Sequence, residues 1–258
     1  MIDTHAHLTG AVYPSVKELL SRAENAGVKR IIAVGFDEKS SKESMQIASD
    51  NHNVFFTAGI HPSECKTVDY RSIDQLLPLF SNKKCLAVGE IGLDYHYGKD
   101  SKEEQKELFI EQLKLAKRVK LPVVIHSREA TQDMLKILTE HKDCLQKGFL
   151  MHCYSESIES AKQYSDLGAY FAFGGAITFK NAKKEDIIRS IDINKLLCET
   201  DCPYMSPVPY RGQTNEPARV REVYNKMAEI LQIQPSELIK KVRENAVSFF
   251  GESNLGER

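Results

Sequence analysis

The chain begins MIDTHAHL (1–8), an apolar segment that carries two histidines near its end. Side chains two positions apart share one face of a β-strand, so Asp3, His5 and His7 are expected to point in one direction. Similar apolar runs return along the chain, and most of them close on a histidine or an acid. The eight runs span residues 1–8, 30–36, 54–62, 85–95, 121–127, 148–155, 169–177 and 195–204.

Segments with helical spacing separate these runs. In residues 102–120, Leu108, Phe109, Leu113 and Ala116 form an apolar stripe with charged residues on the opposite face. The other segments expected to be helical are residues 15–27, 129–141, 157–168, 216–231 and 235–250, whereas residues 179–194 are short of any clear period.

Eight apolar runs joined by helical crossovers predict an α/β fold, the (β/α)₈ TIM barrel, as a single domain over residues 1–258. A doubly wound open sheet is the competing architecture. It usually has fewer strands and often a G-x-G-x-x-G fingerprint, which this sequence lacks.

Composition narrows the functional classes. An apolar fraction of 41% supplies a large core and excludes a disordered chain, and a net charge of −1 excludes strong global attraction to nucleic acid but leaves room for a local basic groove. The six cysteines are scattered without a C-x-x-C pair, so we expect reduced thiols. With neither a signal peptide nor an apolar run of membrane-spanning length, we expect a cytoplasmic protein that does not engage the membrane.

Histidines and acids lie late in the runs. Because parallel barrel strands open their carboxyl ends on one face, these side chains are expected to meet at one mouth. Imidazole and carboxylate groups together suit Zn²⁺, Mn²⁺, Fe²⁺ or Co²⁺. A single such histidine would more simply be a hydrogen-bonded core residue, but the whole set is hard to explain by packing. The set comprises His5, His7, His61, Glu90, His126, His152, Glu199 and Asp201.

Nucleophilic catalysis is an alternative use of the mouth. The sequence has no G-x-S-x-G elbow, which argues against a serine hydrolase. Cys153 and Cys202 lie near the predicted mouth, but small buried thiols explain them more simply than covalent catalysis does.

Seven motifs resemble the TatD family of metal-dependent hydrolases and run in family order along nearly the whole chain. They are DTHAHL (3–8), GIHP (59–62), GEIGLDY (89–95), PVVIHSR (122–128), MHCYS (151–155), ETDCPY (199–204) and PYRGQTNEP (209–217). The resemblance implies a TIM-barrel deoxyribonuclease of the amidohydrolase-like superfamily.

The resemblance also implies two divalent metal ions per subunit, which could be Zn, Mg, Mn, Fe or Co. His5, His7 and Asp201 would hold one ion and His126 and His152 the other, with Glu90 as the bridge.

In the mechanism expected for such a site, Asp201 accepts the proton of the attacking water. Glu90 also counts as a catalytic residue through its bridging role. We expect His61 to contact the scissile phosphate or to protonate the leaving oxygen. Glu199 and Asp3 would lie behind the ligands and orient them.

Three residues are candidates for substrate binding. Arg211 follows the eighth run in a proline-stiffened loop and offers a planar donor fork for phosphate. Arg128, next to His126, is a second phosphate contact, and Tyr204 could stack on an unpaired base. Each also has an ordinary interpretation as a solvated or loop-packing side chain.

The leading hypothesis is a deoxyribonuclease that trims the 3′ ends of single-stranded DNA, with no obligate protein partner evident. The alternative keeps the site but changes the bond, as in a D-aminoacyl-tRNA deacylase or another ester or amide hydrolase. A second alternative is a non-catalytic, metal-stabilised binding module, although a structural site is normally closed by four ligands and needs no additional acid such as Asp201.

Overall fold

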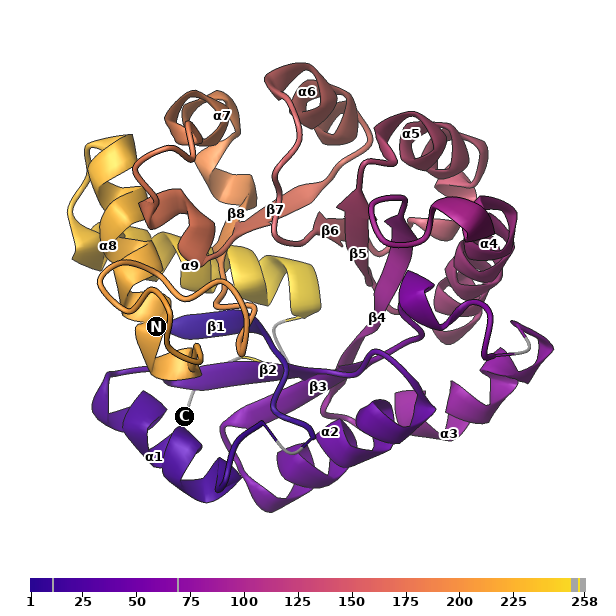
Figure 1. Cartoon of the computed structure of the whole chain (residues 1–258), viewed down its shortest axis with the longest axis horizontal. Helices are drawn as coiled ribbons and strands as arrows, with labels where there is room; N and C mark the ends of the chain where they lie inside the picture. Colours follow the sequence, from indigo (N-terminus) through magenta and orange to yellow (C-terminus); the bar gives the residue numbers. More distant parts are fainter. Residues whose placement is uncertain (11, 69, 252–254, 256–258) are drawn as a thin grey trace.

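The computed structural model describes residues 1–10, 12–68, 70–251 and 255. Eight parallel strands follow one another around a single sheet in chain order, and the helices lie outside them (Figure 1). This arrangement confirms the predicted TIM barrel. The strands are β1 (Ile2–Ala6), β2 (Arg30–Val34), β3 (Val54–Ala58), β4 (Cys85–Asp94), β5 (Val123–Arg128), β6 (Phe149–Met151), β7 (Tyr170–Phe173) and β8 (Leu196–Cys198).

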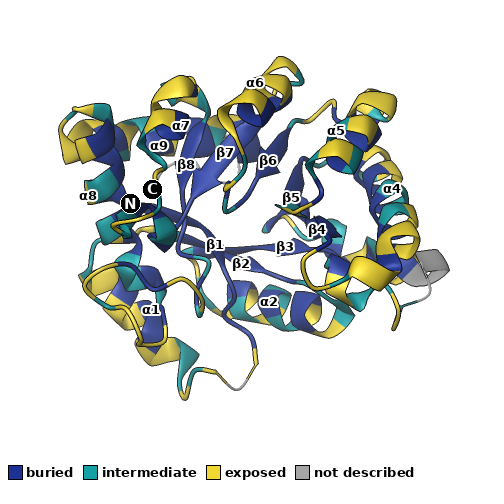
Figure 2. Cartoon of the chain, turned by 45° about the horizontal axis from the view of Figure 1, so that its top comes forward, coloured by how far each residue is buried: buried dark blue, intermediate teal, exposed yellow. Residues whose placement is uncertain are grey.

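The helices alternate with the strands, as the crossover pattern predicts. They are α1 (Val16–Asn25), α2 (Glu38–Asp50), α3 (Leu77–Phe80), α4 (Lys102–Val119), α5 (Thr131–Glu140), α6 (Ile158–Asp166), α7 (Glu185–Ser190), α8 (Val220–Leu231) and α9 (Pro235–Phe250). Figure 2 shows buried strands at the centre and exposed outer faces on the helices. No helix in the described ranges combines the length and apolar character needed to cross a membrane.

Helix boundaries differ from the expected ones where local backbone chemistry decides them. The helix expected from residue 129 begins at Thr131, because Glu129 has a φ of 55°. Helix α2 lacks a strong apolar stripe, and a capping box between Asp37 and Ser40 fixes its start. The poorly periodic segment 179–194 contains only the six-residue helix α7.

The two ends of the sheet meet through residues that carry the candidate site. The Asp201 amide donates to the His5 carbonyl at 2.9 Å, and the His7 amide donates to the Cys202 carbonyl at 2.8 Å. These two bonds flank a parallel bridge between Ala6 and Cys202. The same backbone contacts therefore close the barrel and set His5 and His7 beside Asp201.

Asp3 strengthens this closure from inside the barrel. Its carboxylate accepts hydrogen bonds from the Thr200 amide at 2.9 Å and the Thr200 hydroxyl at 2.6 Å. It also accepts a longer bond, 3.3 Å, from the His5 amide. Asp3 is fully buried, so it ties β1 to the segment after β8 where no water can substitute for it.

The strands deliver their side chains to one open end because α9 covers the other end. The Asn245 side chain donates to the carbonyls of Ile193 and Leu196, at the start of β8. The Phe249 ring packs against Tyr170, the first residue of β7. The amino ends of the strands are thereby closed, and the carboxyl ends carry the pocket described below.

A glycine in β4 allows the closest approach between neighbouring strands. Gly92 pairs with His126 of β5, and a Cβ atom on Gly92 would lie 2.0 Å from the His126 carbonyl oxygen. Its φ of 143° is also unfavourable for other residues. Gly92 therefore lets β4 hold β5 close enough for His126 to reach the acids of β4.

The burial of Asp3 leads to a pH-dependent stability. Burial raises the pKa of Asp3 to about 8, despite the opposing hydrogen bonds from Thr200. The folded chain then keeps a proton that the unfolded chain releases near pH 4, so this group makes stability fall as pH rises through the interval between the two pKa values. Asn can keep the three hydrogen bonds without titrating. We expect urea unfolding to show that Asp3→Asn loses about 1–3 kcal/mol less stability than wild type between about pH 5 and pH 7.5.

The Asp3→Ala variant is the control for this pH test, because it removes the carboxylate and leaves the Thr200 amide unpaired. It should be less stable than wild type by about 1–3 kcal/mol at low pH. Parallel pH curves for wild type and Asp3→Asn would contradict the assignment.

Candidate metal centre

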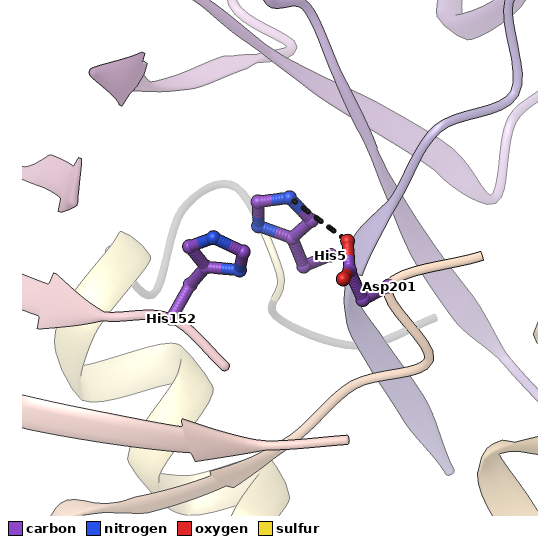
Figure 3. Close-up of side chains that lie close together, drawn as sticks. All are labelled: His5, His152 and Asp201. Carbon is purple, nitrogen blue, oxygen red and sulfur yellow. Dashed lines mark ion pairs between the residues drawn. The ribbon is translucent and has the colours of Figure 1, made fainter. Parts of the chain in front are cut away.

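The carboxylate of Glu90, only 3% exposed, lies at the centre of the mouth. Its Oε2 atom is 3.4 Å from His5 Nε2 and 3.5 Å from His7 Nε2. Asp201 completes this group, with Oδ1 3.5 Å from His7 Nε2 and 3.9 Å from His5 Nε2. Figure 3 shows Asp201 and His5 facing each other, with the His152 ring stacked beside His5.

The other oxygen of Glu90 faces a second group of histidines. Its Oε1 atom lies 3.0 Å from His126 Nδ1 and 2.9 Å from His152 Nε2. His61 Nε2 is slightly farther away, at 3.5 Å. The two oxygens of one carboxylate thus divide the ligands into two groups, contributed by the ends of six strands.

The ring nitrogens approach one another too closely to be explained by ordinary hydrogen bonds. His5 Nε2 lies 3.3 Å from His7 Nε2, and His126 Nδ1 lies 3.2 Å from His152 Nε2. Each close pair can share at most one proton, while both pairs also face Glu90. Such converging lone pairs and carboxylate oxygens suit a divalent cation. Three groups in the described residues have the spacing for one: His5, His7 and Glu90; His5, His152 and Asp201; and His61, Glu90 and His126.

The electrostatics keep Glu90 charged. Burial alone would raise its pKa, but the surrounding histidines, His152 and His61 foremost, outweigh burial and hold the pKa well below its usual range. The buried carboxylate is therefore an anion at neutral pH, as a ligand that neutralises a cation must be.

His61 is held as a neutral imidazole. Its Nδ1 accepts a hydrogen bond from the Ser63 amide at 3.1 Å, so Nε2 carries the ring proton. Burial lowers the pKa of His61 to about 4. At neutral pH it is therefore a hydrogen-bond donor from Nε2, not a source of a full proton.

The sequence analysis missed Asp94, which fixes the ring of His126. Asp94 Oδ1 accepts the amides of His96 and Tyr97, both at 2.9 Å. Its Oδ2 lies 3.1 Å from His126 Nε2, so this nitrogen donates to Asp94 and Nδ1 is left facing Glu90. The strand period could have found it, since Asp94 lies four positions after Glu90 on the same face of β4.

Glu199 lies behind His152. Its Oε1 accepts the Cys153 amide at 2.6 Å and is 3.5 Å from His152 Nδ1. It is fully buried, away from the pocket that contains Asp201. Asp3, by contrast, contacts the His5 backbone and Thr200, so its contribution to the ligands acts through β1.

The ligands open into a cavity of about 690 Å³, large enough for a ligand well beyond a single phosphate. Arg128 and Tyr204 line it, as predicted for substrate contacts, and Lys184 lines it without having been predicted. Arg211 is not among the described lining residues. Its guanidinium stacks on the Phe179 ring at 3.8 Å, outside the cavity.

The Asp94 contact predicts an effect on metal affinity. Asp94→Ala frees the His126 ring to turn, so we expect metal binding to weaken about 10–100-fold in equilibrium dialysis with metal analysis. Asp100→Ala, an exposed acid in the following connection, should bind metal like wild type. Wild-type affinity in the Asp94 variant would show that His126 does not need this partner.

Comparison with known proteins agrees with this geometry. The family described as "TatD related DNase" matches residues 2–251. An uncharacterized metal-dependent hydrolase of Bacillus subtilis, YabD, is 38% identical and covers 97% of this chain and 98% of its own. Its Escherichia coli counterpart YcfH is 35% identical, covering 97% and 95%.

A solved structure extends the comparison to the fold. The Escherichia coli protein YjjV, described as a TatD homolog, superposes with a TM-score of 0.90 at 32% identity, over 96% of this chain and 97% of that one. The family match covers nearly the whole described chain, and the curated relatives are named as metal-dependent hydrolases. This chain belongs to the TatD family and is a metal-dependent hydrolase.

Proposed function

We propose that the protein is a deoxyribonuclease that removes nucleotides from the 3′ ends of single-stranded DNA with a two-metal site. The observation that carries this proposal is the position of Glu90, whose two oxygens face two separate groups of ligands. The family description names a DNase, which supports DNA as the substrate.

In this proposal His5, His7 and Asp201 hold one ion, His126 and His152 hold the other, and Glu90 contacts both. The identity of the ions is open among Zn, Mg, Mn, Fe and Co. A pair of bound cations supplies Lewis-acid polarisation of a phosphoryl oxygen and a lowered pKa for the attacking water.

The protein's own groups then have distinct tasks. Asp201 lines the cavity, and its pKa is held low by His7 and the neighbouring histidines in spite of burial. It is an ionised acceptor for the proton of the attacking water. His61 donates a hydrogen bond from Nε2 to a phosphate oxygen, which replaces the expectation of full proton donation because its pKa is only about 4.

Substrate contacts come from the cavity wall. Arg128 has its guanidinium 4.8 Å from the centre of the Tyr97 ring, where it can reach a phosphate while its face is supported. Tyr204 is 62% exposed at the rim and can stack on an unpaired base. Arg211 would grip the strand farther out, beyond the cavity.

The general-base role of Asp201 gives the test of this function. We expect Asp201→Asn to lower the release of nucleotides from 3′-labelled single-stranded DNA about 100–10,000-fold, measured with Mg²⁺, Mn²⁺ or Zn²⁺. Glu64→Gln is the matched control. Glu64 lines the same cavity but bonds only to Ser63 and Thr67 in the described structure, so its variant should stay within about threefold of wild type.

Two results would contradict the proposal. Release that persists in Asp201→Asn would remove the assigned base. No release from wild type shown to hold two ions would transfer the site to another bond, such as the ester of an aminoacyl-tRNA, or to a non-catalytic binding role.

A further inference from the structure

Lys184 is a cation without an acidic partner inside the cavity. It is half-buried just before α7, and its amine donates to the Ser155 carbonyl at 2.6 Å. An ammonium has three hydrogens to donate, so one bond to a carbonyl leaves two donors unused by the contacts described. Burial lowers the pKa of Lys184, which means that the fold bears a cost to keep the cation there.

Surface lysines of this chain behave differently. Lys42, Lys114 and Lys117 each lie against a carboxylate, at 2.5–2.7 Å. Within the described part of the chain, no carboxylate lies within ion-pair distance of Lys184. The cavity thus contains a positive charge that the protein itself does not neutralise.

The position of Lys184 separates it from the reacting centre. It lies beside Cys153, whose amide is bonded to Glu199, and it shares the cavity wall with Ser155 and Arg128. A phosphate bound at Glu90 would therefore leave Lys184 free for a different anionic group. The cavity volume of about 690 Å³ has room for both.

We propose that Lys184 holds a second, non-reacting phosphate of the substrate, next to the one at the metal ligands. The substrate class that fits is a chain with consecutive phosphates, such as an oligonucleotide, and not an isolated phosphodiester. This inference rests on the proposed nuclease function and adds a specificity-determining residue to it.

The test compares two neighbouring lysines. The probe is a dye-labelled tetrathymidylate with phosphorothioate linkages, which keeps its charges and resists hydrolysis. We expect Lys184→Met to weaken binding to the metal-loaded protein about 10-fold and to reduce the slope of log affinity against log salt by about 0.7. Lys183→Met, an exposed lysine outside the cavity, should change binding less than about twofold, and Lys184→Arg should keep most of the affinity.

A second readout places the lost contact. On an all-phosphate tetrathymidylate, the loss of kcat/KM in Lys184→Met should exceed its loss on bis(p-nitrophenyl) phosphate about 10-fold, because the small diester has no second phosphate. Equal losses on the two substrates would overturn the inference, as would unchanged binding or equal effects of Lys183→Met and Lys184→Met.

The two proposals can fail separately. The binding comparison needs no cleavage, so a wild-type protein that cleaves no phosphodiester overturns the nuclease function while the affinities still decide the role of Lys184. Cleavage by wild type with no effect of Lys184→Met on oligonucleotide binding overturns only the role of Lys184.

Discussion

The site depends on one buried charge, the carboxylate of Glu90. A carboxylate this deep in a barrel is costly unless positive charge or hydrogen bonds surround it. Here five histidine rings from five strand ends approach its two oxygens within 3.5 Å. Each oxygen faces its own group, and the ring nitrogens within a group converge so closely that a shared cation is the most economical partner. The burial of Glu90 therefore makes sense only together with the histidines.

The barrel makes this convergence possible because its seam and its site share atoms. The backbone bonds that join β1 to the segment after β8 pass through His5, His7 and Asp201. Asp3 locks the same seam from beneath, while Gly92 brings β5 close to β4. Stability of the barrel and placement of the ligands are thus coupled, and residues that touch no ligand ring can still change the centre.

Much of this arrangement follows from the sequence. Period-two strands place His5 with His7, and parallel strands open on one face, so the meeting of Glu90 with the histidines could be predicted without coordinates. The helix α2 and the short helix α7 were harder to predict, because capping chemistry and not an apolar stripe fixes α2, and because α7 is too short to show a period.

The residues missed at the site have a common cause. Lys184 comes from a connection whose course no periodic pattern records, and its significance is visible only from the acids that are not near it. Asp94 lay within a motif already recognised, but its task depends on which nitrogen of His126 it meets. The position of Arg211 on Phe179, outside the cavity, likewise depends on how one loop packs on another.

The central claim is that Glu90 lies between two cations, and a crystal structure of the metal-loaded protein with anomalous scattering data tests it most directly. The account predicts two anomalous peaks, one beside Glu90 Oε2 near His5, His7 and Asp201, and one beside Oε1 near His126 and His152. A single peak at this mouth, or peaks that Glu90 does not contact, would contradict it.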